Sequence, residues 1–280
     1  MLAPFLVGAL ALLVVPAAGM FLLIFIAYDG LSPPAWAGMQ NIAYVFNDRL
    51  FWIAARNSIV FVALAVPLRL LGALAIALLL SQRRRGVGLY RVAVYLPTII
   101  PDVAYALIWL WIFNPLYGPL NRAIGAAGLP TPAWLADPTW AFLAIVIMSL
   151  FQIGEGVVVF LAGLRDIPEE LYQAAAIDGG SRWQMFRSIT LPLLAPWLLL
   201  LAVRDLLLSS QNTFTPAYLM TGGGPYYATL FMPLLIYEEA FNRFRFGEAA
   251  TMLLLLLLWL GVVLWLTYET LGGWGYADDV

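Results

Sequence analysis

The sequence predicts an all-α membrane protein with six transmembrane helices and both termini in the cytoplasm. Three observations predict this fold class: the composition, the number of long apolar windows, and the placement of arginine. Of the 280 residues, 63% are hydrophobic and only 11% are charged. A soluble protein of this composition would leave too much apolar surface in contact with water.

Six charge-poor windows are long enough to cross a bilayer, because about 20 residues at ~1.5 Å each span a ~30 Å hydrocarbon layer. A secretory signal peptide is the alternative for the first window, but that window lacks a basic n-region and is longer than an h-region. A shorter stretch at 229–241 predicts a re-entrant or interfacial helix. The expected spans cover about 2–27, 57–80, 92–113, 139–163, 190–212 and 249–271.

Arginine gives the orientation, because cytoplasmic loops carry an excess of basic residues. The opposite loops, at 28–56, 114–138 and 213–248, spread their arginines over a longer total length. No linker or internal repeat divides the chain, which predicts a single membrane domain over 1–280. The loops at 81–91 and 165–188 are therefore predicted to be cytoplasmic, and they contain Arg83, Arg84, Arg85 and Arg91, and Arg165, Arg182 and Arg187, respectively.

Missing residue types exclude several functions. With no Cys and no His, the chain has no disulfides, thiolate nucleophiles, His-based acid–base chemistry or Cys/His metal sites. All 14 basic residues are Arg, and a phosphate-binding P-loop requires a Lys, so the chain is not itself a P-loop ATPase. The formal net charge of -2 gives no indication of a nucleic-acid partner.

The segment 165–192 has the signals of two short helices joined by a tight turn. Asp166 followed by Glu169 resembles an N-terminal cap, and Pro168 suits a first turn, so a helix is expected to start near 167. Gly179-Gly180 predicts a left-handed stop. Ser181 with Gln184 then has the spacing of a second capping box.

The first of these helices has the shape of a docking surface. Ala174, Ala175 and Ala176 allow another protein to approach the backbone closely, while Leu171 and Tyr172 offer apolar contact. Helices and caps alone fit an amphipathic hairpin on the membrane surface equally well.

The spacing within this segment carries a family resemblance. Gln173-Ala174-Ala175 is followed after three residues by Gly179, then after nine by Ile189, and after one more by Leu191-Pro192. This pattern resembles the EAA loop of binding-protein-dependent ABC importer permeases, in the carbohydrate-uptake branch that includes maltose and glycerol-3-phosphate permeases. The turn 219–225, with Thr221 and Pro225 around three glycines, resembles the turn that follows the fifth span in that branch.

The resemblance implies the type I permease fold in the inner (plasma) membrane, with a sugar or oligosaccharide as the solute. It implies a second permease subunit forming a heterodimer, two ATP-binding subunits that carry ATP and Mg²⁺, and an extracytoplasmic solute-binding protein; no cofactor is expected on this chain. Gln173 replaces the usual Glu of the loop, so a salt bridge to the ATPase at that position is in doubt. The expected ATPase-coupling residues are Glu170, Gln173, Ala174, Ala175, Asp178 and Gly179.

Polar residues inside the spans are costly in a bilayer and are therefore candidates for a substrate pathway. Asp205, Ser209 and Asn212 share one face of the fifth span, and Gln152 and Glu155 are three residues apart in the fourth. Carboxylates and amides suit the hydroxyl groups of sugars. An ion pair between Asp205 and either Arg69 or Arg204 is the alternative structural role, and inter-helix hydrogen bonds are the alternative for Gln152 and Glu155.

Two other function classes fit some of these features. An ion-coupled secondary transporter of a small polar solute would use Asp102, Glu155 or Asp205 as its coupling site, but such carriers usually have more spans and inverted repeats. An intramembrane enzyme would need Asp102 and Asp205 to meet, which nothing in the sequence indicates.

Overall fold

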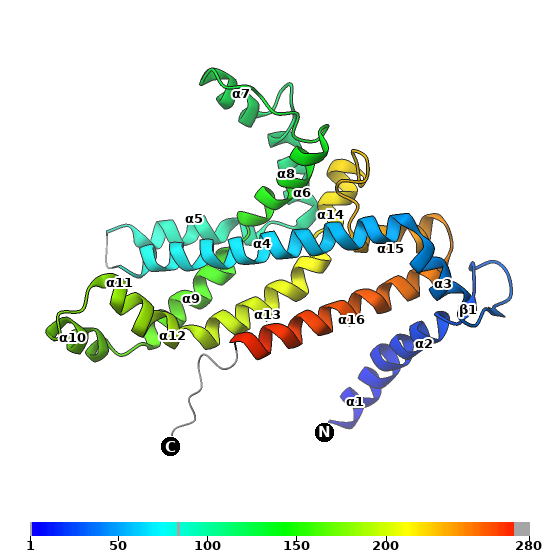
Figure 1. Cartoon of the computed structure of the whole chain (residues 1–280), viewed down its shortest axis with the longest axis horizontal. Helices are drawn as coiled ribbons and strands as arrows, with labels where there is room; N and C mark the ends of the chain where they lie inside the picture. The colour runs from blue at the N-terminus through cyan, green and yellow to red at the C-terminus, as the bar shows by residue number, and fades with distance from the viewer. Residues whose placement is uncertain (1, 83–84, 272–280) are drawn as a thin grey trace.

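The computed structural model describes residues 2–82 and 85–271 and is built almost entirely of helices (Figure 1). Among the described residues, three helical segments are long and apolar enough to cross a membrane: Ala3–Leu23, Arg49–Ser81 and Phe246–Thr270. Three further pairs of helices meet the same test as bent pairs. Arg83 and Arg84, which helped to predict the orientation, lie outside the described residues.

The first and last spans are close to the expected windows. The first consists of α1 (Ala3–Ala9), a π-helical turn (Leu10–Val14) and α2 (Val15–Leu23), and the last is α16 (Phe246–Leu271). The second span, α4 (Arg49–Ser81), starts earlier than the expected residue 57. Asp48 caps this helix by accepting a hydrogen bond from the Leu50 amide at 2.9 Å, so the helix takes in residues that were expected to form an outer loop.

The other three spans are broken. The third consists of α5 (Val87–Ile99) and α6 (Asp102–Ile112), which meet at 103°. Pro101 stands at the break, where a proline ring removes a backbone donor and disfavours a continuous helix. The fourth consists of α8 (Pro138–Leu150) and α9 (Gly154–Asp166), at 43°, and the fifth bends by 62° between residues 193 and 195. The fourth span was expected at about 139–163, and the bent pair covers that window with a break that was not predicted.

The fifth span includes several short helical pieces on either side of its bend. It begins with α11 (Arg182–Met185), a π-helical turn (Phe186–Thr190) and α12 (Leu191–Leu193). After the bend it continues as α13 (Ala195–Asn212), α14 (Phe214–Pro216) and a second π-helical turn (Ala217–Thr221). The helical run thus extends beyond residue 212, its expected end.

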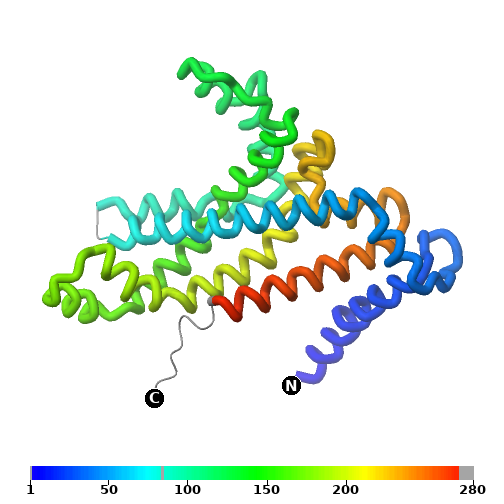
Figure 2. Tube along the Cα trace, viewed as in Figure 1, coloured from blue at the N-terminus to red at the C-terminus, as the bar shows by residue number. Residues whose placement is uncertain are grey.

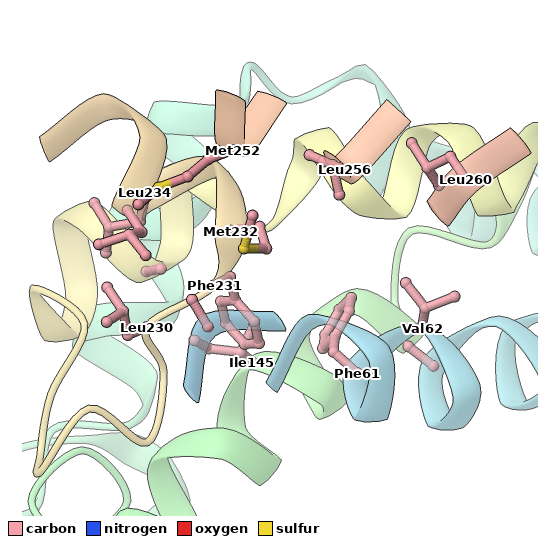
Figure 3. Close-up of a cluster of buried hydrophobic side chains, with 14 of the residues drawn as sticks. Phe61, Val62, Ile145, Leu230, Phe231, Met232, Leu234, Met252, Leu256 and Leu260 are labelled. Atoms are coloured by element: carbon pink, nitrogen blue, oxygen red, sulfur yellow. The ribbon is translucent and has the colours of Figure 1, made fainter. Parts of the chain in front are cut away.

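The main core lies where α4, α13 and α16 run beside one another, with α13 between the other two (Figure 1). The expected helix at 229–241 is α15 (Met232–Tyr237) followed by a π-helical turn (Glu238–Asn242), and α15 packs on both α4 and α16. Phe231 meets Phe61 of α4 edge to face, with ring centroids 5.4 Å apart, among the buried side chains of Figure 3.

A second body, formed by α6, α7 (Pro119–Ala126) and α8, projects away from the long helices (Figure 2). It has its own aromatic cluster, which includes Tyr105, Trp109, Phe113 and Trp134. Asn121 organises its outer loop by donating to the carbonyls of Pro115 and Pro132 and accepting from the Trp134 indole at 2.9 Å. The Pro- and Gly-rich loop at 114–138 is therefore ordered.

A small two-stranded ribbon and one short helix lie at the end of the long helices that is farther from the segment 165–190 (Figure 1). Strands β1 (Ile26–Ala27) and β2 (Ala35–Trp36) pair antiparallel, and α3 (Gln40–Asn47) follows. The buried Asn41 side chain donates to the carbonyls of Ile24 and Ile26 at 2.9 and 3.0 Å, respectively. The first span is thus attached to the rest of the chain mainly through its last residues.

Candidate functional site

The helical hairpin at 165–190 forms as two short helices, but its first cap differs from the prediction. The first helix, α10, runs from Glu169 to Ile177 and has Pro168 at its N-cap position, without a side-chain cap. Asp166 is the last residue of α9 and does not cap α10. The start predicted near 167 was therefore two residues early, because Ile167 and Pro168 are extended.

The turn after α10 forms as the sequence predicts. Gly179 has φ +75°, a left-handed conformation that L side chains rarely adopt. The Gly180 amide donates back to the Ala175 carbonyl at 2.8 Å, which satisfies one of the last carbonyls of the helix. Ser181 and Gln184 form the predicted capping box at the start of α11.

Most of the predicted coupling residues are accessible on the hairpin surface. Ala175 is half-buried, whereas the others are exposed: Glu170, Gln173, Ala174, Asp178 and Gly179. Leu171 is 43% exposed, so its side chain is accessible for apolar contact as predicted. Tyr172 is not accessible in this way, because its hydroxyl forms a hydrogen bond with the Thr190 hydroxyl at 2.8 Å and its ring packs on the core. Tyr172 therefore attaches α10 to the π-helical turn Phe186–Thr190.

The hairpin is continuous with two membrane helices. Its first leg follows α9 through Ile167, which is buried, and its second leg leads through α12 into α13. Close to the hairpin, α9 and α13 touch at Gly163, where a Cβ atom would lie 2.5 Å from the Trp197 ring. A movement of the hairpin would therefore be transmitted to these two helices.

Deeper in the same region, four charged side chains from three helices form one network. Arg69 of α4 pairs with Asp205 of α13 at 3.4 Å, and its guanidinium also donates to Ser209 at 3.5 Å. Arg204 reaches Asp205 at 3.1 Å and pairs with Glu155 of α9 on its other side. The two positive and two negative charges balance one another, as polar groups in a membrane require.

The network has a buried half and an accessible half. The side chains of Arg69 and Asp205 are each 7% exposed, whereas those of Arg204 and Glu155 are 33% and 44% exposed. The cavity beside the network, which Gln152 also lines, has a volume of only about 10 Å³. A volume of that size holds about one water molecule.

The predicted polar faces are only partly brought together. Asp205 and Ser209 share a buried face as expected, whereas Asn212 is exposed. Gln152 lies in the break between α8 and α9, so Gln152 and Glu155 do not share a continuous helical face. The ion pair that was left open as the alternative role of Asp205 forms with both arginines.

Aromatic residues near the break between α8 and α9 are mostly buried. Tyr105 is buried and donates its hydroxyl to the Met148 carbonyl at 2.8 Å. Trp109 contacts Phe113 and Phe151 with tilted rings, and the ring centroids are 5.0 Å apart in each pair. Of these rings, Phe151 is the most accessible, at 53% exposure.

Sequence reasoning missed a buried acid in the loop before the last span. Glu239 is fully buried, and it pairs with Arg243 and, at 3.8 Å, with Arg245. Burial raises the pKa of the Glu239 carboxyl, and the charge of Arg243 opposes that shift. Arg243, four residues after the acid, was the available signal, because that is the spacing of an ion pair on a helix.

Comparison with known proteins identifies the family. The model of the family described as "Binding-protein-dependent transport system inner membrane component" matches residues 69–272. The chain belongs to this family. The match covers the hairpin and the whole charged network, so both are features of a permease subunit of an ABC importer rather than of an enzyme.

Individual relatives agree with this assignment. The permease is 35% identical over 283 residues to a probable ABC transporter permease, YesP, of Bacillus subtilis, covering 99% of this chain and 91% of the relative. It is 34% identical to the trehalose/maltose transport system permease MalF of Thermococcus litoralis, covering 89% of this chain and 83% of the relative.

A solved structure supports the fold. A chain from a bacterial ABC transporter involved in import of the acidic polysaccharide alginate has a TM-score of 0.85, covering 96% of this chain and 93% of that one. At 23% identity this likeness concerns the fold alone. The permease therefore has the predicted importer fold, and its bent spans are compatible with that fold.

Proposed function

We propose that the permease forms the translocation pathway of an ATP-driven importer for a sugar or oligosaccharide and is coupled to a separate ATPase through the hairpin at 165–190. The observation that carries this proposal is the hairpin itself, an accessible unit whose second helix is capped and which is continuous with two membrane helices. The sugar is proposed because the relative from Thermococcus litoralis is described as a trehalose/maltose permease. Membership of this family argues against the alternative function, an ion-coupled secondary transporter.

The coupling surface is proposed to consist of Glu170, Gln173, Ala174, Ala175, Asp178 and Gly179. Small side chains and an exposed helix end allow a groove of another protein to approach the backbone of α10. Two ATP-binding subunits would supply ATP and Mg²⁺, and no cofactor is proposed for this chain. Gln173 would take part through shape and hydrogen bonds, because its amide carries no charge.

The proposed topology has six spans, with both termini in the cytoplasm, in one domain over 1–280 of the inner membrane. Counting each of the three bent pairs as one span gives up to six among the described residues. The hairpin lies between the fourth and fifth of these spans, where Arg165, Arg182 and Arg187 favour the cytoplasmic side. The extracytoplasmic binding protein would dock at the opposite face.

The substrate pathway is proposed to run past Gln152, Glu155, Asp205, Ser209 and Asn212. A sugar site of ordinary size needs about 300 Å³ or more, far more than the cavity of about 10 Å³ beside the network. A second permease subunit would therefore have to enclose the pathway. In that arrangement Glu155, Gln152 and Asn212 offer accessible polar groups, while Asp205 and Ser209 fix Arg69 behind them.

Co-purification in mild detergent tests the proposal. The permease, expressed with its second permease subunit, is expected to bring down an ATPase whose activity rises when a sugar-loaded binding protein is added. Absence of any co-purifying ATPase would overturn the importer assignment. Reconstituted vesicles that import an amino acid but none of a panel of mono- and oligosaccharides would overturn the sugar.

A further inference from the structure

The two membrane helices attached to the hairpin are joined to each other at two depths. Near the hairpin, α9 and α13 meet at Gly163 and Trp197. The second junction is the ion pair between Glu155 and Arg204. Glu155 lies eight residues before Gly163 and Arg204 seven residues after Trp197, so the second junction is about 10 to 12 Å farther from the hairpin at ~1.5 Å per residue.

The start of α9 is fixed against its other neighbours. A Cβ atom at Gly154 would lie 2.7 Å from the Val94 carbonyl of α5, and one at Gly156 would lie 3.1 Å from the Ala73 side chain of α4. These backbone contacts surround Glu155 on both sides in the sequence. Glu155 is therefore held in place relative to α4 and α5 by the backbone on either side of it.

The two ion pairs of the network differ in the cost of separating them. Arg69 and Asp205 are buried, and parting them would leave the Arg69 guanidinium without its carboxylate partner in an apolar interior. Arg204 and Glu155 are each exposed by a third or more, so water in the proposed translocation pathway would solvate both when they part. Arg204 also pairs with Asp205 at 3.1 Å, so its charge still has a carboxylate partner when Glu155 moves away.

We infer that the Glu155–Arg204 ion pair is a reversible link that opens and closes during the transport cycle, while the Arg69–Asp205 pair stays closed. The inference rests on the proposed function, in which the ATPase moves the hairpin. The closed link holds α9 and α13, and hence the two legs of the hairpin, in the arrangement described here. Arg204 acts as a positioning residue that couples the hairpin to the spans.

Cysteine cross-linking tests whether this distance changes. The chain has no Cys, so Glu155→Cys with Arg204→Cys introduces a unique pair into the permease. With a short bifunctional maleimide, the cross-linking yield is expected to differ several-fold between the nucleotide-free complex and the complex held with a non-hydrolysable ATP analogue. Equal yields in a complex whose ATPase still responds to the binding protein would overturn the link but not the proposed function.

Single substitutions test the link without removing both side chains. Glu155→Gln and Arg204→Gln are each expected to raise ATP hydrolysis without binding protein several-fold and to lower the solute imported per ATP. Arg204→Lys, which keeps the charge, is expected to retain most of the coupling. The matched control is Glu269→Gln, an exposed carboxylate near the end of α16, which is expected to change neither quantity.

These variants separate a coupling role from a role in substrate contact alone. A residue that only touches the solute would raise the KM for import and leave binding-protein-independent hydrolysis unchanged. That pattern for both Glu155→Gln and Arg204→Gln would overturn the link. If the double-cysteine permease does not assemble, the single variants still decide the matter.

Discussion

The hairpin at 165–190 and the charged network around Asp205 are held together by different kinds of contact. The hairpin is built from contacts between residues close in sequence, such as the capping box of Ser181 with Gln184. The network joins residues more than a hundred positions apart, such as Arg69 and Asp205. A region built from local contacts keeps its predicted shape, whereas the role of a buried charge depends on its distant partners.

The largest effect is expected when the buried half of the network loses one partner. Arg69→Leu removes the guanidinium that lies between Asp205 and Ser209. Loss of one member of a buried ion pair typically costs about 3–5 kcal/mol when the other charge is left unpaired, and Arg204, at 3.1 Å from Asp205, offsets part of that cost. The unfolding temperature of the detergent-solubilised permease is expected to fall markedly.

The control for this variant removes both charges. Arg69→Leu with Asp205→Leu leaves no unpaired charge at this position, and Arg204 keeps Glu155 as its partner. The double variant is expected to be more stable than Arg69→Leu alone. If it is less stable, the two residues do not form the buried pair described here.

A smaller effect is expected at the junction between the two regions. Gly163→Ala places a Cβ atom 2.5 Å from the Trp197 ring, so the ring or the helix has to shift. Overpacking of this kind costs about 1–3 kcal/mol. Gly261→Ala, in α16 with nothing within 4 Å, is the control and is expected to be neutral or stabilising in the same thermal assay.

The turn of the hairpin is expected to be sensitive for a purely local reason. Gly179→Val forces a β-branched residue to φ +75°, at a backbone cost of about 1–2 kcal/mol, although nothing lies within 4 Å of the new Cβ. Membrane insertion is expected to be normal, while the amount of co-purified ATPase falls and transport is lost.

A matched glycine outside the hairpin separates strain from docking. Gly128 has φ +74° and also has nothing within 4 Å, but it lies after α7. Gly128→Val is expected to cost similar stability and to leave ATPase co-purification unchanged. Equal loss of ATPase in both variants would contradict the coupling role of the hairpin.

The smallest effect is expected at Gln173. Because this side chain is exposed on α10, Gln173→Glu changes charge without changing packing. ATPase co-purification is expected to be unchanged or improved, since a carboxylate is the usual residue in the EAA loop. A large loss of complex assembly would count against the assignment of Gln173 to the docking surface.

The sequence by itself determined the features that depend on neighbouring residues. Apolar windows gave the helical spans, and Gly179 with Ser181 gave the turn and second cap of the hairpin. Such features follow from backbone sterics, local hydrogen bonds and burial in a bilayer, which act over a few residues. The spacing of the hairpin motif was also sufficient to indicate the family.

Only the tertiary structure decided which polar groups neutralise one another. Asp205 carries the same sequence signal whether it faces a solute or an arginine, and the approach of α4 selects the arginine. The break at Gln152 could not be predicted from neighbouring residues either. It lies beside Gly154, where α5 packs closely, and α5 is far away in the chain. Charges in a low-dielectric interior respond to every nearby charge, so their roles are set by the assembled helices rather than by any one of them.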